Sequence, residues 1–464
     1  MRGSRIARPA TFRLALVVAA TAIVLTAIGA SRAAADGTGT TLTGTLPDGA
    51  TYLIQVPADW NGTLLLYSHG YVAPGSPNPA EDVGDPLTGQ WLLDHGYALA
   101  GSSYATTGWS VEQAIPDQID TLDTFAAEVG TPSRTIAWGH SLGGMITAGL
   151  LQDHPDRFTA ALPMCGVLAG GVGAWNGALD SAFSIQQLLG QGSGLQVVHI
   201  TNPLLNLLLG EQLLLVAQLT PQGRARIALA AALGDVPGWF DPASPEPAAS
   251  DYATQELNQY QWETQVDAAF GFLLRAELEA RAGGNPSWNT GVNYEKQLEN
   301  SIDLAEVKAL YKDAGLSLDA DLATLRSAPR IAADPNAVAY LTRNIVYNGN
   351  LGGKPVLTIH TTGDGLVPDQ HEQAYRSVVQ DAKDQQLLRE AFVHRAGHCT
   401  FTPAETISAL QALVDRIDTG KWRTDPDALN AAAAALGPAL NTASPSFLDF
   451  DPTPFLRPYD LGTH

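Results

Sequence analysis

The chain has 464 residues, with 26 lysines and arginines against 47 aspartates and glutamates, which gives a formal net charge of −21. An acidic surface repels polyanions, so this balance argues against nucleic acids and anionic membranes as partners. The length is sufficient for a catalytic domain with a large insertion.

The first 35 residues predict a secretory signal peptide. Four arginines lie at or before residue 13, an apolar run follows from residue 14 to residue 30, and Ala33-Ala34-Ala35 forms an A-x-A cleavage site. The apolar run approaches the length of a membrane span, so a retained anchor is the alternative. We expect cleavage near Ala35 and a secreted protein with no stable membrane anchor.

The next part of the chain predicts strands alternating with helices. A hairpin over residues 37–60 turns at Pro47-Asp48-Gly49. Further strands are expected at 63–68, 97–102, 135–138 and 158–164, with helices over 115–129 and 145–152 between them. This alternation is typical of an α/β protein with a mostly parallel sheet.

Gly139-His140-Ser141-Leu142-Gly143 joins the strand at 135–138 to the helix at 145–152. A strand, a sharp turn and a helix in this order are typical of a nucleophile elbow. Glycines permit the turn, which exposes the Ser141 hydroxyl and directs the Leu142 amide at a bound carbonyl group. The pentapeptide alone also fits an ordinary strand-to-helix turn.

An acid and a base follow in the order that the elbow requires. A strand at 354–360 leads into the loop that carries Asp364, and a strand at 387–393 leads into the loop that carries His398. The candidates are therefore Ser141 as nucleophile, Asp364 as acid and His398 as base. Weaker alternatives are Asp369 and Asp334 for the acid, and His394 and His371 for the base.

Together with the strand at 63–68, which ends in His69-Gly70-Tyr71, these motifs resemble the α/β-hydrolase superfamily of serine hydrolases. The resemblance covers residues 45–166 and 345–420, and it includes both esterase or lipase-like and prolyl or tripeptidyl aminopeptidase-like enzymes. It implies a mostly parallel sheet flanked by helices. It also implies an oxyanion hole made by the amides of Leu142 and Tyr71, with Gly70 as the alternative to Tyr71.

The resemblance predicts a core formed by residues 36–166 and 345–464, with residues 167–344 inserted between the sixth and seventh strands as a helical cap. Leucine-rich segments at 204–209 and 213–216 fit either an acyl pocket or the interior of the cap. Looser pocket candidates are aromatic: Trp175, Trp239, Phe240, Trp262 and Trp288. Thr402-Pro403-Ala404-Glu405 predicts the capping box of the last core helix, and residues 430–464 are expected to form loop and short helix.

The chain has two cysteines, Cys165 and Cys399. In a sheet of this family both lie toward the catalytic edge, so we expect a disulfide that holds the loop of His398. A pair of buried thiols is the alternative.

The resemblance implies an acyl-enzyme mechanism that needs no metal and no cofactor. We expect a carboxylic-ester hydrolase acting on a small-molecule or polymeric ester. The first alternative is a serine aminopeptidase, in which cap carboxylates such as Glu256, Glu263 and Asp267 hold the ammonium group of the substrate. The second alternative is a non-catalytic homologue that binds a ligand.

Overall fold

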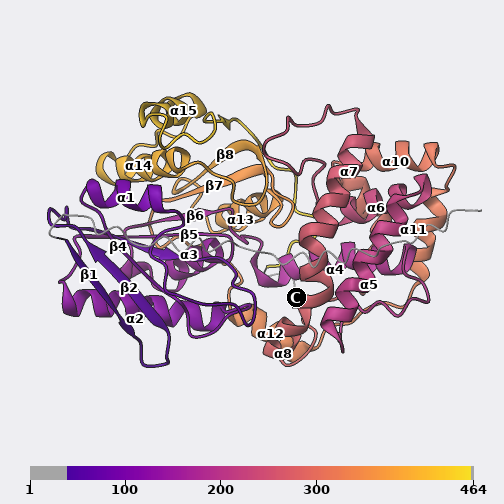
Figure 1. Ribbon diagram of the computed structural model, residues 1–464, viewed down its shortest axis with the longest axis horizontal. Coiled ribbons are helices and arrows are strands. Elements are labelled where there is room, and N and C mark those ends of the chain that lie inside the picture. The colour runs from indigo at the N-terminus through magenta and orange to yellow at the C-terminus, as the bar shows by residue number, and fades with distance from the viewer. Residues whose placement is uncertain (1–38, 461–464) are drawn as a thin grey trace, which may run out of the picture. The chain divides into compact units, whose positions relative to one another are not determined.

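The structure is a computed structural model that describes residues 39–460 (Figure 1). The expected signal peptide, residues 1–35, lies outside the described residues. The strands are β1 (Thr40–Thr45), β2 (Thr51–Val56), β3 (Thr63–Ser68), β4 (Ala98–Ser102), β5 (Arg134–His140), β6 (Ala160–Met164), β7 (Val356–Gly363), β8 (Leu388–Ala396) and β9 (Phe447–Leu448). The helices outside the segment between β6 and β7 are α1 (Pro86–Asp94), α2 (Val111–Glu128), α3 (Leu142–Asp153), α13 (Gln370–Asp381), α14 (Pro403–Thr419) and α15 (Pro426–Ala435).

The strands form one nine-stranded sheet in the order β1-β2-β4-β3-β5-β6-β7-β8-β9. The six strands from β4 to β8 in this order are parallel to their neighbours, whereas β1, β2 and β9 pair antiparallel at the edges. The predicted α/β fold with a mostly parallel central sheet is therefore confirmed. Parallel order brings the C-terminal ends of β5, β7 and β8 to the same edge of the sheet, where the loops carrying Ser141, Asp364 and His398 begin.

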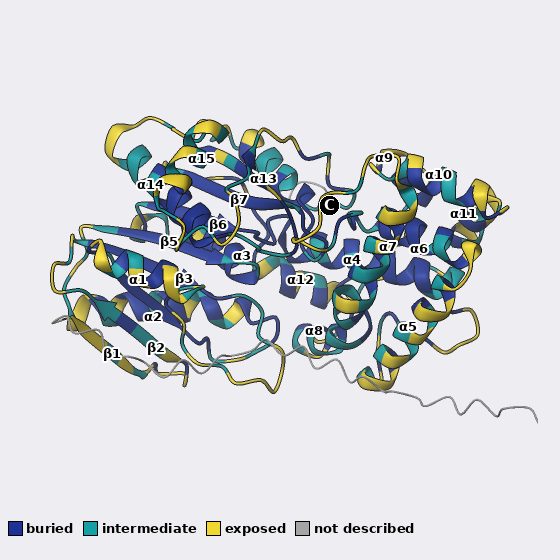
Figure 2. Ribbon diagram, turned by 45° about the horizontal axis from the view of Figure 1, so that its top comes forward, coloured by how far each residue is buried: buried dark blue, intermediate teal, exposed yellow. Residues whose placement is uncertain are grey.

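Both faces of the central strands are buried, as Figure 2 shows for the dark strands, whereas the edge strand β1 is largely exposed. Side chains of β3 alternate between the two faces: Leu64 and Leu66 pack with α2, α3 and α13, whereas Leu65 and Tyr67 pack with α1, α14 and α15. A continuous apolar strand covered on both sides is what a parallel sheet requires.

Nine α-helices of the described chain lie between β6 and β7. They are α4 (Gly170–Leu188), α5 (Pro203–Gln218), α6 (Pro221–Leu233), α7 (Tyr252–Trp262), α8 (Arg275–Ala282), α9 (Tyr294–Asn300), α10 (Leu304–Asp313), α11 (Leu318–Ser327) and α12 (Pro335–Arg343). We call them the inserted helices; Figure 1 draws them from magenta to orange. Two π-helical turns, Glu263–Asp267 and Phe270–Leu274, join α7 to α8.

The leucine-rich segments fit the expected cap interior only in part and do not line the expected pocket. They form α5, where Leu204, Leu205, Leu215 and Val216 are more than half exposed and only Leu214 is fully buried. None of these residues lines the pocket next to Ser141. Helix α5 therefore does not line this pocket, and only one side of it packs into a core.

The C-terminal region contains one predicted and one unexpected feature. The capping box is present, because the Thr402 hydroxyl accepts a hydrogen bond from the Glu405 amide and the Glu405 carboxylate accepts one from the Thr402 amide. The tail, expected to be loop and short helix, also adds β9 to the edge of the sheet, where Phe447 pairs with Val393. Among the described residues, no helix is long and apolar enough to cross a membrane.

Candidate active site

Ser141 occupies the turn between β5 and α3 with a left-handed backbone (φ 58°, ψ −123°). The flanking glycines are sterically required, because a Cβ atom on Gly143 would overlap the carbonyl oxygen of Ser68, and one on Gly139 would overlap that same oxygen. The strained serine and its two glycines fit the geometry of a nucleophile elbow.

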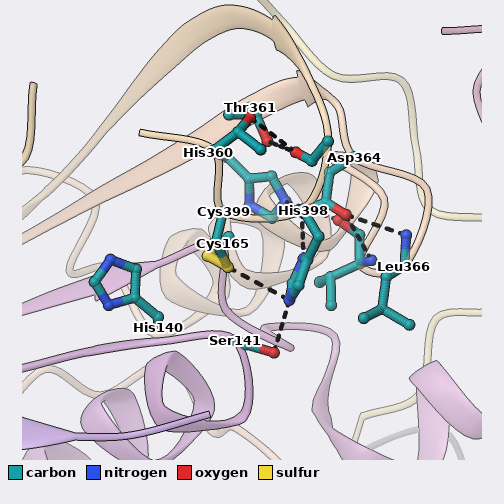
Figure 3. Close-up of a disulfide and its surroundings, with 12 residues drawn as sticks. His140, Ser141, Cys165, His360, Thr361, Asp364, Leu366, His398 and Cys399 are labelled. Atoms are coloured by element: carbon teal, nitrogen blue, oxygen red, sulfur yellow. Dashed lines mark hydrogen bonds and ion pairs between the residues drawn. A yellow bond between two sulfur atoms is a disulfide. The ribbon is translucent and has the colours of Figure 1, made fainter. Parts of the chain in front are cut away.

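Three side chains from distant parts of the sequence meet above this turn (Figure 3). His398 Nε2 lies 2.8 Å from Ser141 Oγ, and His398 Nδ1 lies 2.7 Å from Asp364 Oδ2. Asp364 is buried, whereas the side chain of His398 is 19% exposed. The His398 imidazole therefore contacts both the hydroxyl and the carboxylate while keeping access to solvent.

Asp364 is held as a carboxylate. The amides of Leu366 and Val367 donate to its Oδ1. Burial alone would raise its pKa, but the charges of His398 and His360 lower the pKa to about 2. A buried carboxylate in this position orients an imidazole and stabilises its charged form.

His360 is a functional candidate that the sequence analysis missed. Its Nδ1 lies 2.9 Å from Glu372 Oε1, and its Nε2 lies 2.8 Å from the Val367 carbonyl oxygen and 3.6 Å from Asp364 Oδ2. Both ring nitrogens face acceptors, so both carry a proton. Burial opposes the charge, but the nearby carboxylates of Asp364 and Glu372 raise the pKa of His360 to about 10. His360 lies within an apolar strand, and no motif around it in the sequence distinguishes a charged histidine from one that only packs in the core.

Cys165 and Cys399 form the expected disulfide, with 5.4 Å between their Cα atoms. Cys165 follows β6, and Cys399 is next to His398 in the chain. The Cys399 sulfur lies 3.4 Å from His398 Nε2. The disulfide therefore ties the loop of His398 to the strand next to the elbow.

The alternative acids and bases have other partners. His394 faces outward and pairs with Glu246 at 2.8 Å. His371 Nδ1 accepts a hydrogen bond from the Ala169 amide, and burial followed by the charge of His360 lowers its pKa to about 3. Asp334 accepts a hydrogen bond from the Asn285 amide among the inserted helices. His371 lines the same pocket as Ser141, but its Nδ1 is occupied by the Ala169 amide and not by the serine hydroxyl.

Asp369, His69 and His140 also lie outside this group of three side chains. Asp369 lines a second cavity that is separate from the pocket next to Ser141. His69 Nδ1 contacts the carbonyl oxygen of Gly70. His140 points away from Ser141 and its Nδ1 bonds to Tyr67 at 3.1 Å (Figure 3).

The proposed oxyanion residues border the same space as Ser141. Leu142 is the first residue of α3, whose first amides have no acceptor within the helix. Tyr71 and Leu142 both line the pocket that contains Ser141. Gly70 lies against the serine, since a Cβ atom there would be 3.4 Å from Ser141 Cβ.

The pocket next to Ser141 encloses about 960 Å³ of empty space, including the part open to solvent. One wall comes from the loop after β7 and another from the inserted helices. The lining is mainly apolar and includes six aromatic side chains: Tyr71, Trp109, Trp175, Phe270, Phe272 and Phe455. Of the aromatic residues that the sequence suggested for the pocket, only Trp175 is among them. The apolar character of this lining suits an acyl or aromatic group.

Two carboxyl groups face this aromatic pocket from the first π-helical turn. Glu263 accepts a hydrogen bond from the Ser181 hydroxyl, and burial raises its pKa to about 7. Burial, together with the charges of Glu263 and Asp364, also raises the pKa of Asp267. The third predicted carboxylate, Glu256, bonds to Gln218 and does not line the pocket. No lysine or arginine is among the described residues that line it.

The sheet order, the elbow after β5 and the pocket define an α/β-hydrolase of the serine hydrolase class. Residues 95–170, which include the elbow, match the prolyl oligopeptidase family. The chain is 32% identical to an o-phthalyl amidase from Xanthobacter agilis over 424 residues, which is 84% of this chain and 90% of the amidase. The protein belongs to the same α/β-hydrolase family as that amidase.

Solved structures of similar proteins have low sequence identity. Feruloyl esterase B from Aspergillus oryzae is 14% identical, with a TM-score of 0.38 and coverage of 83% of this chain and 81% of the esterase. An acylaminoacyl peptidase from Pyrococcus horikoshii is 11% identical, with a TM-score of 0.35 and coverage of 78% of this chain and 38% of the peptidase.

Proposed function

We propose that the protein hydrolyses carboxylic esters of bulky or aromatic acids through Ser141, His398 and Asp364. The contact of His398 with both Ser141 Oγ and Asp364 Oδ2 is the observation that supports this proposal most directly. A serine hydroxyl is a weak nucleophile until a base removes its proton, and His398 Nε2 is within reach of that proton.

In the proposed reaction, Ser141 Oγ attacks the ester carbonyl carbon while His398 takes the hydroxyl proton. Asp364 stabilises the imidazolium, and the amides of Leu142 and Tyr71 bind the oxyanion. His398 then protonates the departing alcohol, which leaves an acyl group on Ser141. Water, activated by His398, releases the acid and restores the serine.

We further propose that the inserted helices form a cap over the site, with residues 167–344 as its bounds. The support is that one pocket wall comes from α4 and the two π-helical turns, whereas Ser141 and Leu142 come from the core. A cap of this kind determines which acyl groups enter, because the catalytic residues contact only the carbonyl carbon and its two oxygens.

Amide hydrolysis is the second candidate function, and the name of the o-phthalyl amidase supports it. An amide of an aromatic acid fits the same aromatic pocket as an ester. The aminopeptidase form of this candidate is supported by Glu263 and Asp267, since a pocket with two carboxyl groups and no lysine or arginine favours an ammonium group over a carboxylate.

A paired set of substrates distinguishes these candidates. The mature protein is assayed with p-nitrophenyl acetate and p-nitrophenyl benzoate, and with benzoyl, phthalyl and aminoacyl p-nitroanilides. We expect faster hydrolysis of the benzoate than of the acetate, and no hydrolysis by Ser141→Ala. Faster cleavage of the anilides than of the esters would favour amide hydrolysis as the function. Appreciable activity of Ser141→Ala would reject the proposed mechanism.

We also propose that the protein is exported and loses its first 35 residues. The Cys165–Cys399 disulfide supports export, because disulfides persist mainly in oxidising compartments. Mass spectrometry of protein from the culture medium should give an N-terminus at Asp36. A full-length chain confined to the cells would contradict this proposal.

A further inference from the structure

A buried histidine in the lining of the active-site pocket has no role in the proposed mechanism. His371 lies in the first turn of α13 and is 3% exposed. It borders the same pocket as Ser141. The charges of His360, Asp364 and His398 all act on its pKa, which places the His371 ring near the proposed triad. His371 is therefore a polar residue that a substrate in this pocket can meet.

Two contacts fix the orientation of the His371 ring. The Ala169 amide, at the start of α4, donates a hydrogen bond to His371 Nδ1 at 3.1 Å. The Phe455 ring lies 4.8 Å from the imidazole ring, measured between centroids. Neither contact uses Nε2, which has no hydrogen-bond partner among the described residues. Nε2 is not fully enclosed by protein atoms, and its exposed surface lies on the pocket side.

The hydrogen bond from Ala169 also determines where the ring proton lies. Nδ1 accepts the amide hydrogen, so Nδ1 carries no proton of its own. Burial, followed by the charge of His360, lowers the pKa of His371 to about 3, and the imidazole is neutral at neutral pH. A neutral imidazole carries one proton, which must then be on Nε2. His371 therefore presents an N–H donor, and no acceptor, to the pocket.

The surroundings of this donor determine which group it can bind. An ammonium group has only donors, so it cannot pair with an N–H group. A carboxylate would accept the hydrogen bond, but Glu263 and Asp267 face the same pocket, and no lysine or arginine of its described lining would balance the added charge. An uncharged oxygen, as in an ether, ketone or hydroxyl group, needs no such balance. The rest of the lining is mainly apolar, which suits the ring that would carry this oxygen.

We propose that His371 Nε2 donates a hydrogen bond to an uncharged oxygen on the acyl group of the substrate, so that the protein prefers aromatic acyl groups with such an oxygen. This proposal rests on the proposed ester hydrolysis, because it concerns the group that fills the pocket during that reaction. His371 is then a specificity-determining residue and takes no part in proton transfer to or from Ser141. A buried donor left without an acceptor costs free energy, so an acyl group that lacks the oxygen should bind less well.

Matched pairs of esters test this preference. Methoxy and ethyl groups have nearly the same shape, but only methoxy carries an oxygen, so p-nitrophenyl 2-, 3- and 4-methoxybenzoates are compared with the corresponding ethylbenzoates. Each kcat/KM is divided by the rate of alkaline hydrolysis of the same ester, which removes the electronic effect of the substituent. We expect the wild type to favour at least one methoxy ester about 5- to 10-fold. In His371→Phe, which keeps an aromatic ring and removes the donor, this preference should disappear.

Two further variants separate loss of the donor from loss of fold. His371→Gln places an amide N–H group near the position of Nε2 and should retain part of the preference. His95→Phe makes the same change as His371→Phe at an exposed position and should retain all of it. A smaller amount of folded protein lowers both rates of a pair together, so it leaves their ratio unchanged.

Three results would overturn the proposal while leaving ester hydrolysis in place. Equal corrected rates within all pairs in the wild type would show that no oxygen is recognised. A preference that persists in His371→Phe and disappears in Asp267→Leu would assign the oxygen to the first π-helical turn. Faster corrected hydrolysis of a carboxybenzoate ester than of any methoxybenzoate would show that the donor binds an anion. Hydrolysis of none of these esters by the wild type would instead reject the proposed function, and this proposal with it.

Discussion

His360 and Asp364 lie at the end of β7 with 3.6 Å between His360 Nε2 and Asp364 Oδ2, and both side chains are buried. Glu372 of α13 contacts the other nitrogen of His360 at 2.9 Å. His360 is therefore a buried cation between two carboxylates. It keeps Asp364 charged and fixes its position, without contacting Ser141.

His360→Gln tests this positioning role. Without the imidazolium, Asp364 loses a neighbouring charge, so we expect its pKa to rise and kcat to fall about 10- to 100-fold with little change in KM. The acid limb of the kcat profile should move to higher pH, a shift that simple misfolding would not produce. His95→Gln is the matched control, because His95 is exposed and should leave the profile unchanged. An unchanged acid limb in His360→Gln would reject the role.

The catalytic assignment is tested with Ser141→Ala, His398→Ala and Asp364→Asn. Each should lower kcat by about 10³-fold or more, because each removes a member of one unit. Ester hydrolysis is measured after circular dichroism has confirmed the fold. Residual activity near the wild-type level in any of them would contradict the assignment.

The backbone conformation of Ser141 should also lower the stability of the folded protein. Its backbone has φ 58°, a region that favours glycine. We expect Ser141→Gly to be more stable than Ser141→Ala by about 1 kcal/mol, because only glycine relieves this strain. Urea unfolding of the two inactive variants measures the difference. Equal urea midpoints for the two variants would show that the backbone strain at residue 141 does not lower stability.

The disulfide should contribute both stability and activity. Replacing both Cys165 and Cys399 with alanine should lower the free energy of unfolding by about 2–4 kcal/mol, because the bond restricts the unfolded chain. It should also lower kcat, since Cys399 adjoins His398. Dithiothreitol should lower the free energy of unfolding of the wild type and leave that of the double variant unchanged. A double variant with wild-type kcat would show that the loop of His398 is held by other contacts.

Stability should fall as pH rises from about 5 to 9. The pKa is raised by burial to about 7 for Glu263 and Asp303 and to about 9 for Glu306, so the folded chain holds more protons than the unfolded chain in this range. His360 acts in the same direction: its contribution is complete below pH 6.5 and is lost as pH rises through about 10. Asp364 acts oppositely, since its stabilisation is lost only as pH falls toward 2.

Thermal unfolding at constant ionic strength tests this dependence. The midpoint should decrease between pH 5 and pH 9, and Glu306→Gln should flatten the decrease. The exposed substitution Glu299→Gln should leave the slope of the wild type unchanged. A midpoint that rises across this range would show that the buried acids are ionised and paired.

The sequence by itself determined the sheet, the elbow and the order of the candidate residues. These signals are local: apolar strands end in turns, glycines flank Ser141, and Thr402 and Glu405 lie three residues apart. The pairing of Cys165 with Cys399 followed because parallel strands end at one edge of the sheet. Each of these features depends on a few neighbouring residues or on a general rule of topology.

Only the tertiary structure decided which side chains of the inserted helices face a cavity, the core or solvent. Helix α5 carries leucines on all sides, so its sequence has no apolar stripe that distinguishes an exposed face. β9 exists only because β8 offers an unpaired edge. The charge of His360 and the protonation of Glu306 follow from burial and from partners far away in the sequence, which no local pattern records.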